Sequence, residues 1–125
     1  MAIDSERLKE LGERTLECTV SHDWVGLREL YADDAVWHTP NAPLLSDELT
    51  TRIEGGNAIV EFYKLFTAGL QGAQFEPLGC FTGCDLHVQL WRLGSRVGVD
   101  VTRFGSDEKI IEQFDVLPEH STLSL

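Results

Sequence analysis

The sequence has little positive charge. Lys and Arg make up 10 of its 125 residues, against 21 Asp and Glu, so the formal net charge is −11. The few cations are scattered along the chain and form no cluster. A surface of this kind repels phosphate backbones and anionic lipid. The composition therefore argues against nucleic acids and membrane surfaces as partners.

Long hydrophobic runs are missing as well. No apolar stretch approaches the roughly 20 residues that cross a bilayer. The first residues, MAIDSER, lack the basic-then-apolar order of a secretion signal. We therefore expect a cytoplasmic protein with one domain over residues 1–125, in which 118–125 form a tail.

Cysteine is scarce, with Cys18, Cys80 and Cys84 only. An odd number at these spacings argues against a disulfide framework. Cys80 and Cys84 have no second pair of cysteines near them in the sequence, so they make a poor zinc motif. We expect small buried thiols and no metal site.

Hydrophobic periodicity predicts helices followed by strands. Apolar residues recur at helical spacing in three segments, 4–20, 24–31 and 57–70. β-Branched and aromatic runs between turn residues predict strands at 35–38, 74–93, 97–104 and 109–116. Residues 39–55 between the second and third helices predict a long loop, which is a possible lid. Helices first and an antiparallel sheet afterwards is the order of an α+β fold.

Alternation in the predicted hairpin separates two kinds of side chain. A two-residue turn at 94–95 would place Gln89 opposite Asp100 and His87 opposite Thr102. The polar residues then share one face of the sheet, and the aliphatic residues share the other.

This pattern has two interpretations. In the first, which periodicity alone favours, the valine-rich face packs on the helices and the polar face meets water. In the second, the polar face lines a pocket under the helices and the aliphatic face packs on a second subunit. Trp91, Phe104 and Ile111 favour the second, because a water-facing surface rarely needs such residues. Burial would also raise the pKa of the carboxyls, which could then act as general acids or bases near neutral pH.

Three stretches of the chain carry a family resemblance: 31–40 (YADDAVWHTP), 56–62 (GNAIVEF), and 100–104 (DVTRF) with 109–115 (KIIEQFD). Through them the chain resembles the nuclear transport factor 2-like superfamily. Within it, the chain resembles the SnoaL-like polyketide cyclases and ketosteroid isomerases. The resemblance covers about residues 8–118. It implies a cone-shaped α+β barrel, with N-terminal helices packed on a curved, mainly antiparallel sheet.

The resemblance also implies roles for single residues. Asp100 matches the oxyanion-hole aspartate of the isomerases, whereas Thr39 stands where their base lies and Thr15 falls near their tyrosine. His38, before Thr-Pro, partly matches a histidine of the SnoaL-like cyclases, and Asp115 matches the acid that ends one of their strands. The isomerase mechanism is thus incomplete in this chain.

We therefore predict a homodimer, joined through the outer face of the sheet, with a pocket for a small apolar or carbonyl-containing ligand. The predicted function is cofactor-free acid–base chemistry, as an isomerase, cyclase or lyase, on a small, largely apolar carbonyl or polyketide-like substrate. The alternative is a non-catalytic ligand-binding or dimeric interaction domain. The candidate catalytic residues are Asp100, His87, Asp115 and His38. The candidate substrate-binding residues are Trp24, Trp37, Phe62, Tyr63, Phe66, Gln89, Trp91, Phe104 and Gln113.

Overall fold

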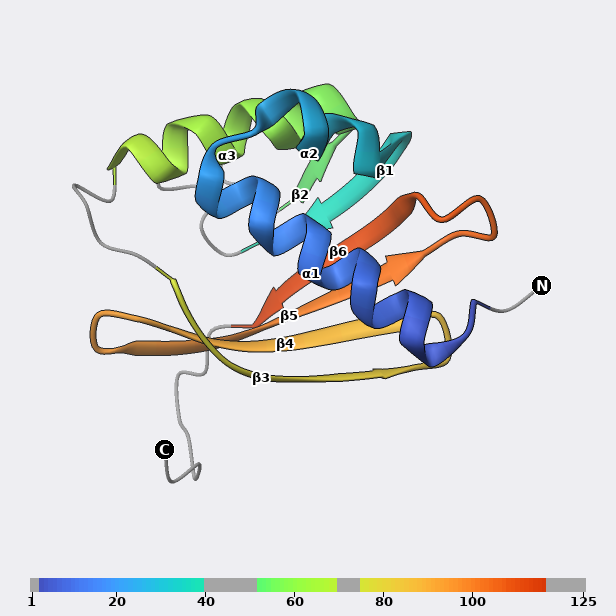
Figure 1. The fold of residues 1–125 in the computed structure, drawn as a ribbon. Coiled ribbons are helices and arrows are strands. Elements are labelled where there is room, and N and C mark those ends of the chain that lie inside the picture. The colour runs from blue at the N-terminus through green and yellow to red at the C-terminus, as the bar shows by residue number, and fades with distance from the viewer. Residues whose placement is uncertain (1–2, 40–51, 70–74, 117–125) are drawn as a thin grey trace.

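Three helices lie against one curved sheet in a computed structural model that describes residues 3–39, 52–69 and 75–116 (Figure 1). The helices are α1 (Ser5–Ser21), α2 (Trp24–Leu30) and α3 (Gly56–Gly69). The strands are β1 (Tyr31–His38), β2 (Arg52–Glu54), β3 (Glu76–Gly83), β4 (Leu86–Leu93), β5 (Arg96–Phe104) and β6 (Ile110–Val116). Most of the predicted 39–55 loop and the whole 118–125 tail lie outside the described residues.

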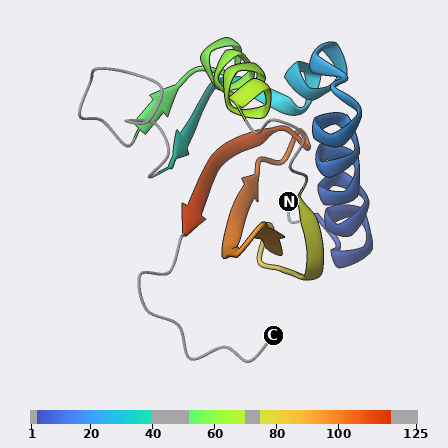
Figure 2. The same cartoon turned by 90° about the vertical axis from the view of Figure 1, so that its left-hand side faces the viewer.

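The sheet order is β2-β1-β6-β5-β4-β3. β1 runs parallel to β6, and every other pair of neighbouring strands is antiparallel. Figure 2 shows the strands curling around the space that the helices cover. Helix α1 contacts β3 and β4, while α3 packs on β1 and β2. The expected α+β cone with N-terminal helices is confirmed.

Side-chain caps and one left-handed residue define where the first two helices begin and end. The Asp4 side chain accepts a hydrogen bond from Arg7 N, and Asp23 accepts one from Gly26 N, each at 3.0 Å. A carboxylate at these positions satisfies an N–H that the first helical turn leaves free. His22 takes a left-handed conformation, φ 59°, and ends α1 just before the second cap. α1 can therefore cross the open sheet while α2 turns back toward β1.

Two strands differ from the sequence-based expectation at the edge of the sheet. The run predicted over 74–93 is a hairpin, with Cys84 and Asp85 at its turn, at φ 53° and 63°. Left-handed turn positions favour Gly or Asn, so the sequence carries little signal for this turn. Strand β2 lies inside the segment predicted as a loop. At three residues it is too short to show alternation.

Strand β1 also begins earlier than expected. Tyr31, predicted to end the second helix, is the first strand residue and pairs with Ile110 of β6. β1 pairs with β6 at Tyr31 and again from Val36, and Asp33 and Asp34 lie in the irregular stretch between these points, extended although their intrinsic strand propensity is poor.

The core fills the space between the helices and β1. Leu8, Leu27, Ile59 and Ile110 are all fully buried there. Of the three cysteines, Cys18 is buried as predicted, whereas Cys80 and Cys84 are exposed. The prediction of buried thiols was wrong for these two, because the undetected hairpin places them at the edge of the sheet.

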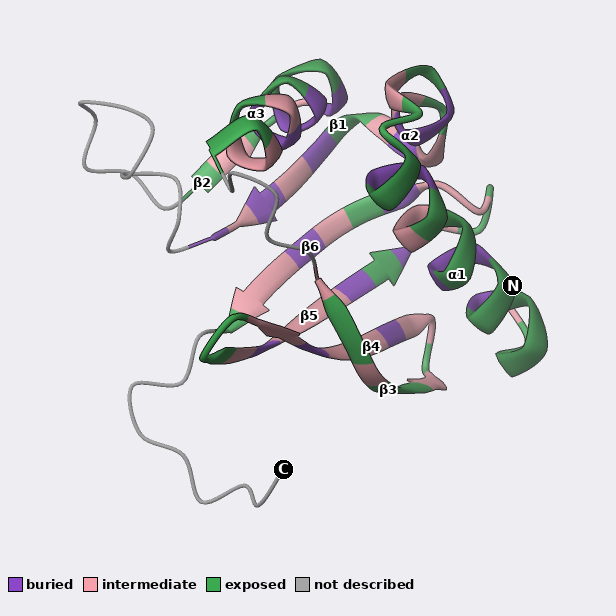
Figure 3. Ribbon diagram, turned by 60° about the vertical axis from the view of Figure 1, so that its left-hand side comes forward, coloured by how far each residue is buried: buried purple, intermediate pink, exposed green. Residues whose placement is uncertain are grey.

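The inner face of the sheet is the polar one. The register predicted for β4 and β5 is confirmed, with Gln89 opposite Asp100 and His87 opposite Thr102. Figure 3 shows buried residues alternating along these strands. Ile111 was expected on the same face but is exposed. An irregularity in the β5–β6 pairing turns Ile110 inward in its place.

Candidate functional site

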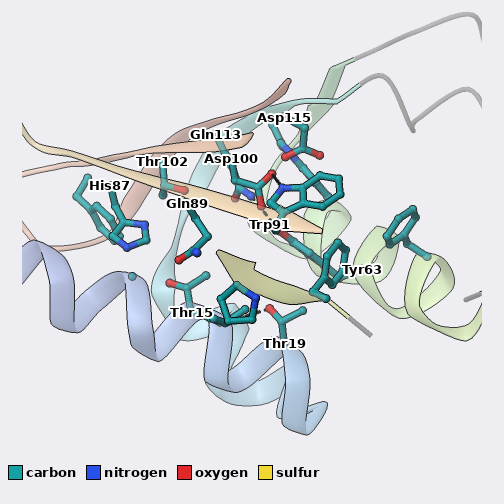
Figure 4. Close-up of a pocket in the computed structure, with 17 residues that line it drawn as sticks. Thr15, Thr19, Tyr63, His87, Gln89, Trp91, Asp100, Thr102, Gln113 and Asp115 are labelled. Atoms are coloured by element: carbon teal, nitrogen blue, oxygen red, sulfur yellow. Dashed lines mark hydrogen bonds between the residues drawn. The ribbon is translucent and has the colours of Figure 1, made fainter. Parts of the chain in front are cut away.

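A cavity of about 80 Å³ lies between α1, α3 and the inner face of the sheet (Figure 4). One water needs about 10–15 Å³ of such space, so the cavity has room for a small organic molecule. Aromatic and apolar side chains form much of its wall, namely Leu16, Trp37, Phe66, Phe75, Pro77, Trp91 and Phe104. Polar groups converge within this wall, most of them from β4, β5 and β6: Tyr63, His87, Gln89, Asp100, Thr102, Gln113 and Asp115.

Asp100 and Asp115 face each other from neighbouring strands. They are paired residues in the β5–β6 register, and both line the cavity. Trp91 Nε1 donates a hydrogen bond of 2.9 Å to Asp100 Oδ1. Burial raises the pKa of Asp100 well above its ordinary value, and the charge and hydrogen bond of Asp115 raise it further, against a small opposing effect of Trp91. A proton on Asp100 is therefore strongly held.

Asp115 differs from its neighbour. Burial raises its pKa as well, but hydrogen bonding with Asp100 and then with Thr39 and Trp37 opposes this effect. The pKa of Asp100 is thus raised by more influences than that of Asp115. The two carboxyls titrate as a pair, and burial favours keeping a proton on the pair.

One hydrogen-bond donor and one acceptor at this end of the cavity are buried without a partner within hydrogen-bond distance in the described part of the chain. Trp37 Nε1 and Asp115 Oδ1 are both buried, and neither has a hydrogen-bond partner at close distance among the described residues. The Trp37 N–H also lies near enough to Asp115 to lower its pKa. A buried polar group without a partner costs about 1–3 kcal/mol, so a ligand that satisfies both atoms would recover part of that cost.

Gln113 is held by two tyrosines. The Tyr31 hydroxyl donates to Gln113 Oε1 at 2.5 Å, and Gln113 Nε2 donates to the Tyr63 hydroxyl at 2.9 Å. All three residues are buried, and burial raises the pKa of both tyrosines. Gln113 lines the cavity as predicted, but its amide oxygen and nitrogen already make hydrogen bonds to the two tyrosines. The bond from Gln113 to Tyr63 fixes the position of the Tyr63 hydroxyl.

His87 lies at the other end of the cavity. In Figure 4 it points toward α1, away from Asp115 and Tyr63. The imidazole is 5% exposed and makes no hydrogen bond to any residue in the described part of the chain. Gly12 of α1 is so close that a Cβ there would lie 2.2 Å from the ring. Burial lowers the pKa of His87, against the opposing charge of Glu13.

His38, also predicted to be catalytic, lies on the outer face of the sheet. Its ring stacks on Phe114, with centroids 4.6 Å apart, and its Nε2 lies 3.5 Å from Glu112 Oε2. The pocket expectation required a bend at the end of β1, but the strand keeps its alternation through His38.

Most of the predicted substrate-binding residues line the cavity, but Trp24 and Phe62 do not. Trp24 stacks on His22, with ring centroids 5.2 Å apart. Phe62 packs edge-on against Trp37, behind the wall. Gln89 lines the cavity, and its Nε2 donates to the carbonyl oxygens of Gly79 and Leu90.

The structure adds cavity residues that the sequence analysis did not select. Gly12, Thr15 and Thr19 face the cavity from α1, and Thr102 does so from β5. The α1 residues are small and recur at helical spacing, a signal that could have identified them. Phe75 and Pro77 carried no comparable signal.

Two further properties of the described segments bear on function. No three His, Cys, Asp or Glu side chains within residues 3–39, 52–69 and 75–116 are grouped as metal ligands would be. No helix in the same segments is long and apolar enough to cross a membrane.

The chain was compared with known proteins. A profile of the SnoaL-like domain matches residues 13–113. No curated protein matches the chain. Solved structures with the same fold include a SnoaL-like protein of unknown function from Burkholderia thailandensis, with a TM-score of 0.82 and 17% identity, covering 94% of this chain and 99% of that one.

A second similar structure is an NTF2-like protein of unknown function from Mesorhizobium loti. It has a TM-score of 0.75 and 24% identity, over 94% of this chain and 97% of that one. A third is a proposed SnoaL-like polyketide cyclase from Shewanella denitrificans, with a TM-score of 0.67 and 19% identity, over 89% and 90% of the two chains. At these identities the structures support the fold alone. The match to the domain profile covers most of the sequence, and the chain belongs to the SnoaL-like domain family.

Proposed function

We propose that this protein is a cofactor-free acid–base catalyst for small, largely apolar carbonyl or polyketide-like compounds, working as an isomerase, cyclase or lyase. The observation that carries the proposal is the unequal carboxyl pair in an apolar cavity. Two facing carboxyls whose pKa values are raised to different extents supply an acid and a base at the same pH.

The two carboxyls would have separate roles. The Asp100 carboxylic acid would donate a hydrogen bond to the carbonyl oxygen of the substrate, where negative charge develops. The Asp115 carboxylate would take a proton from the carbon next to that carbonyl, through its unpartnered Oδ1. Return of the same proton to another carbon completes an isomerisation. Expulsion of a leaving group or attack on a second carbonyl gives a lyase or a cyclase.

The surroundings favour an uncharged substrate. The wall is largely aromatic, the carboxyl pair carries negative charge, and the chain has a net charge of −11. An anion would meet repulsion here. The Trp37 N–H adds a second donor for a substrate oxygen. The proposed polyketide cyclase among the similar structures is consistent with this ligand class.

Deuterium exchange tests the proposal directly. The protein would be mixed with a small aryl ketone such as acetophenone in D₂O, and loss of the proton signal next to the carbonyl followed by NMR. We expect exchange above the buffer rate, reduced on the order of 10²–10⁴-fold in Asp115→Asn and Asp100→Asn. Asp34→Asn, which changes an exposed acid outside the cavity, should behave as wild type. Exchange unaffected by either cavity substitution would refute the carboxyl mechanism.

A binding protein without turnover is the second candidate. The specific observation in its favour is that Asp100 already has a partner within the protein, the Trp91 N–H, and faces Asp115 across the strand pair, as expected of carboxyls that serve structure or recognition. Such a protein would bind the ketone with no exchange above the buffer rate. Ketone titrations followed by the fluorescence of Trp37 and Trp91, run beside the exchange assay, separate the two functions.

A homodimer through the outer face of the sheet is part of the proposal. Phe81, Val88, Val101 and Phe114 form a row of paired positions across that face, and Phe81 is 66% exposed. Exposed apolar rows of this kind usually have a partner. On the same face Arg103 and His38 both lie 3.5 Å from Glu112. The negative charge of Glu112 is therefore offset by neighbouring basic side chains, so two copies would meet on this face without the repulsion that the net charge imposes elsewhere.

A further inference from the structure

We propose that His87 and Thr102 form a second recognition site in the cavity, which binds a hydroxyl group of an elongated, uncharged ligand whose carbonyl lies at the carboxyl pair. This inference rests on the proposed function, because it names the substrate more closely. His87 then positions the ligand and does not act as the proton partner of Asp100.

The first argument is an unused hydrogen-bonding capacity. Buried polar side chains nearly always have a partner. The His87 imidazole is 5% exposed and the Thr102 side chain 7% exposed. Both line the cavity, and neither side chain makes a hydrogen bond to the rest of the described chain. A neutral imidazole offers one donor and one acceptor, and a threonine hydroxyl can do both, which suits a hydroxyl group.

The second argument is that the imidazole is held in place. Helix α1 approaches it at Gly12, where a Cβ would lie 2.2 Å from the ring. The neighbouring Thr15 hydroxyl donates its proton to Leu11 O at 2.9 Å, so it does not donate a hydrogen bond to His87. Only glycine leaves room for the ring at this point, which fixes the position of the ring in the cavity wall beside α1.

The third argument is charge. Burial lowers the pKa of His87, so the ring is uncharged near neutral pH. The charged group that acts on it is Glu13 of α1, whose negative charge would also repel an anion. The site therefore fits a neutral hydroxyl and not a carboxylate or phosphate.

The fourth argument is spacing. His87 pairs with Thr102, and Gln89 pairs with Asp100, so the two polar sites are successive inward-facing rows of the same strands. Such rows are roughly 7 Å apart along a strand. A ligand that reaches both needs two oxygens at about that separation, with an apolar body between them.

A matched pair of ketones tests the site. Acetophenone and 4′-hydroxyacetophenone differ only in a hydroxyl at the far end from the carbonyl. Their binding to wild type and to His87→Leu would be measured by fluorescence titration and by calorimetry. We expect wild type to bind the hydroxylated ketone roughly 3–10-fold more tightly, which is the gain from one net hydrogen bond.

His87→Leu should bind both ketones equally. Thr102→Val, a change of similar volume, should reduce the preference, and Gly12→Ala should abolish it by displacing the ring while the histidine remains. The last variant keeps the test valid if the buried leucine impairs folding. Circular dichroism and thermal melting establish that each variant is folded.

The outcomes separate this inference from the proposed function. Equal binding of the two ketones to wild type, no binding of either, or a preference that survives both His87→Leu and Gly12→Ala overturns the second site. A preference that disappears in these variants supports it, whether or not the ketone exchanges deuterium. Lack of exchange with the preference intact would overturn the catalytic proposal alone.

Discussion

The two faces of the sheet are made by alternate residues of the same strands, yet they reverse the usual distribution of polarity. The inner face carries Asp100, Gln113 and Asp115 inside a cavity, whereas the outer face carries Phe81 and Val116 in the open. Burying carboxyls is unfavourable for stability and exposing a phenylalanine gains nothing. A sheet arranged in this way supports the two proposals made above, a reaction on the inner face and association through the outer face.

The largest effect is expected from breaking the outer face. Phe81→Asp would place a charge in the apolar row, and we expect a dimeric wild type to become monomeric. Light scattering after size-exclusion chromatography measures the mass. Val25→Asp changes a side chain that is 74% exposed on α2, away from the sheet, and should leave the dimer intact. A monomeric wild type, or equal behaviour of the two variants, would contradict the comparison.

On the inner face, the bridge between the two tyrosines is the next most sensitive point. Gln113→Leu removes both hydrogen bonds and leaves the buried Tyr31 and Tyr63 hydroxyls poorly matched. We expect the free energy of unfolding to fall by about 2–4 kcal/mol, measured by urea denaturation. Phe114→Leu, at the next residue but on the outer face, should cost less than about 1.5 kcal/mol. Equal losses would mean that the two faces are equally tolerant.

Glycine at position 98 makes room for an aromatic ring on the inner face. A Cβ at Gly98 would lie 2.2 Å from the Trp91 ring, which donates to Asp100. Gly98→Ala should therefore lower the free energy of unfolding by about 1–3 kcal/mol, through overpacking. The neighbouring outer-face change Val99→Ala should cost about 1 kcal/mol or less. A neutral Gly98→Ala would show that Trp91 can move away freely.

The last effect on the inner face appears only as the pH changes. Because the native pKa of Asp100 is raised, the native state binds more protons than the unfolded state above the ordinary aspartate pKa of about 3.9. Stability from this group is complete below that pH and is lost as pH rises through the native pKa. Asp100→Asn has no carboxyl to ionise at this position, so this variant does not lose stability in this way as pH rises.

The gain of Asp100→Asn over wild type should therefore grow as pH rises from about 4 toward the native pKa of Asp100, by up to about 1.4 kcal/mol per pH unit, and level off above it. Urea denaturation across this range measures it. Asp34→Asn, at an exposed position, should show a constant difference. A constant difference for Asp100→Asn as well would mean that its carboxyl is not perturbed by burial.

Local patterns were enough to predict several features of the fold. Helical spacing predicted the three helices, and the caps Asp4 and Asp23 that begin the first two are equally local, because capping depends on a side chain and a backbone group three residues apart. The β4–β5 register follows from the length of its turn. The turn at Cys84 and the start of β1 at Tyr31 were missed, because pairing with distant strands overrides weak local preference.

The candidate site was predicted in part from a local pattern, the alternation of side chains along the strands. Alternation placed His87, Gln89, Asp100 and Thr102 on one face, and the structure shows them around one cavity. Small residues at helical spacing mark one side of α1, but nothing in the helix sequence states which strands that side will cover. Alternation along β1 points His38 to the face opposite Trp37, and the structure places it there, on the outer face of the sheet and away from the cavity.

The sequence by itself determined the order of helices and strands, the two chemically distinct faces of the sheet and the acidic charge. These depend on neighbouring residues and on composition. Only the tertiary structure decided which face the helices cover, because both faces hold apolar side chains and periodicity cannot rank them. It also decided the acid–base properties of the carboxyls, since burial raises the pKa of both Asp100 and Asp115, and the nearby Asp115 raises that of Asp100 further. Both influences exist only after β5 and β6 are paired beneath the helices.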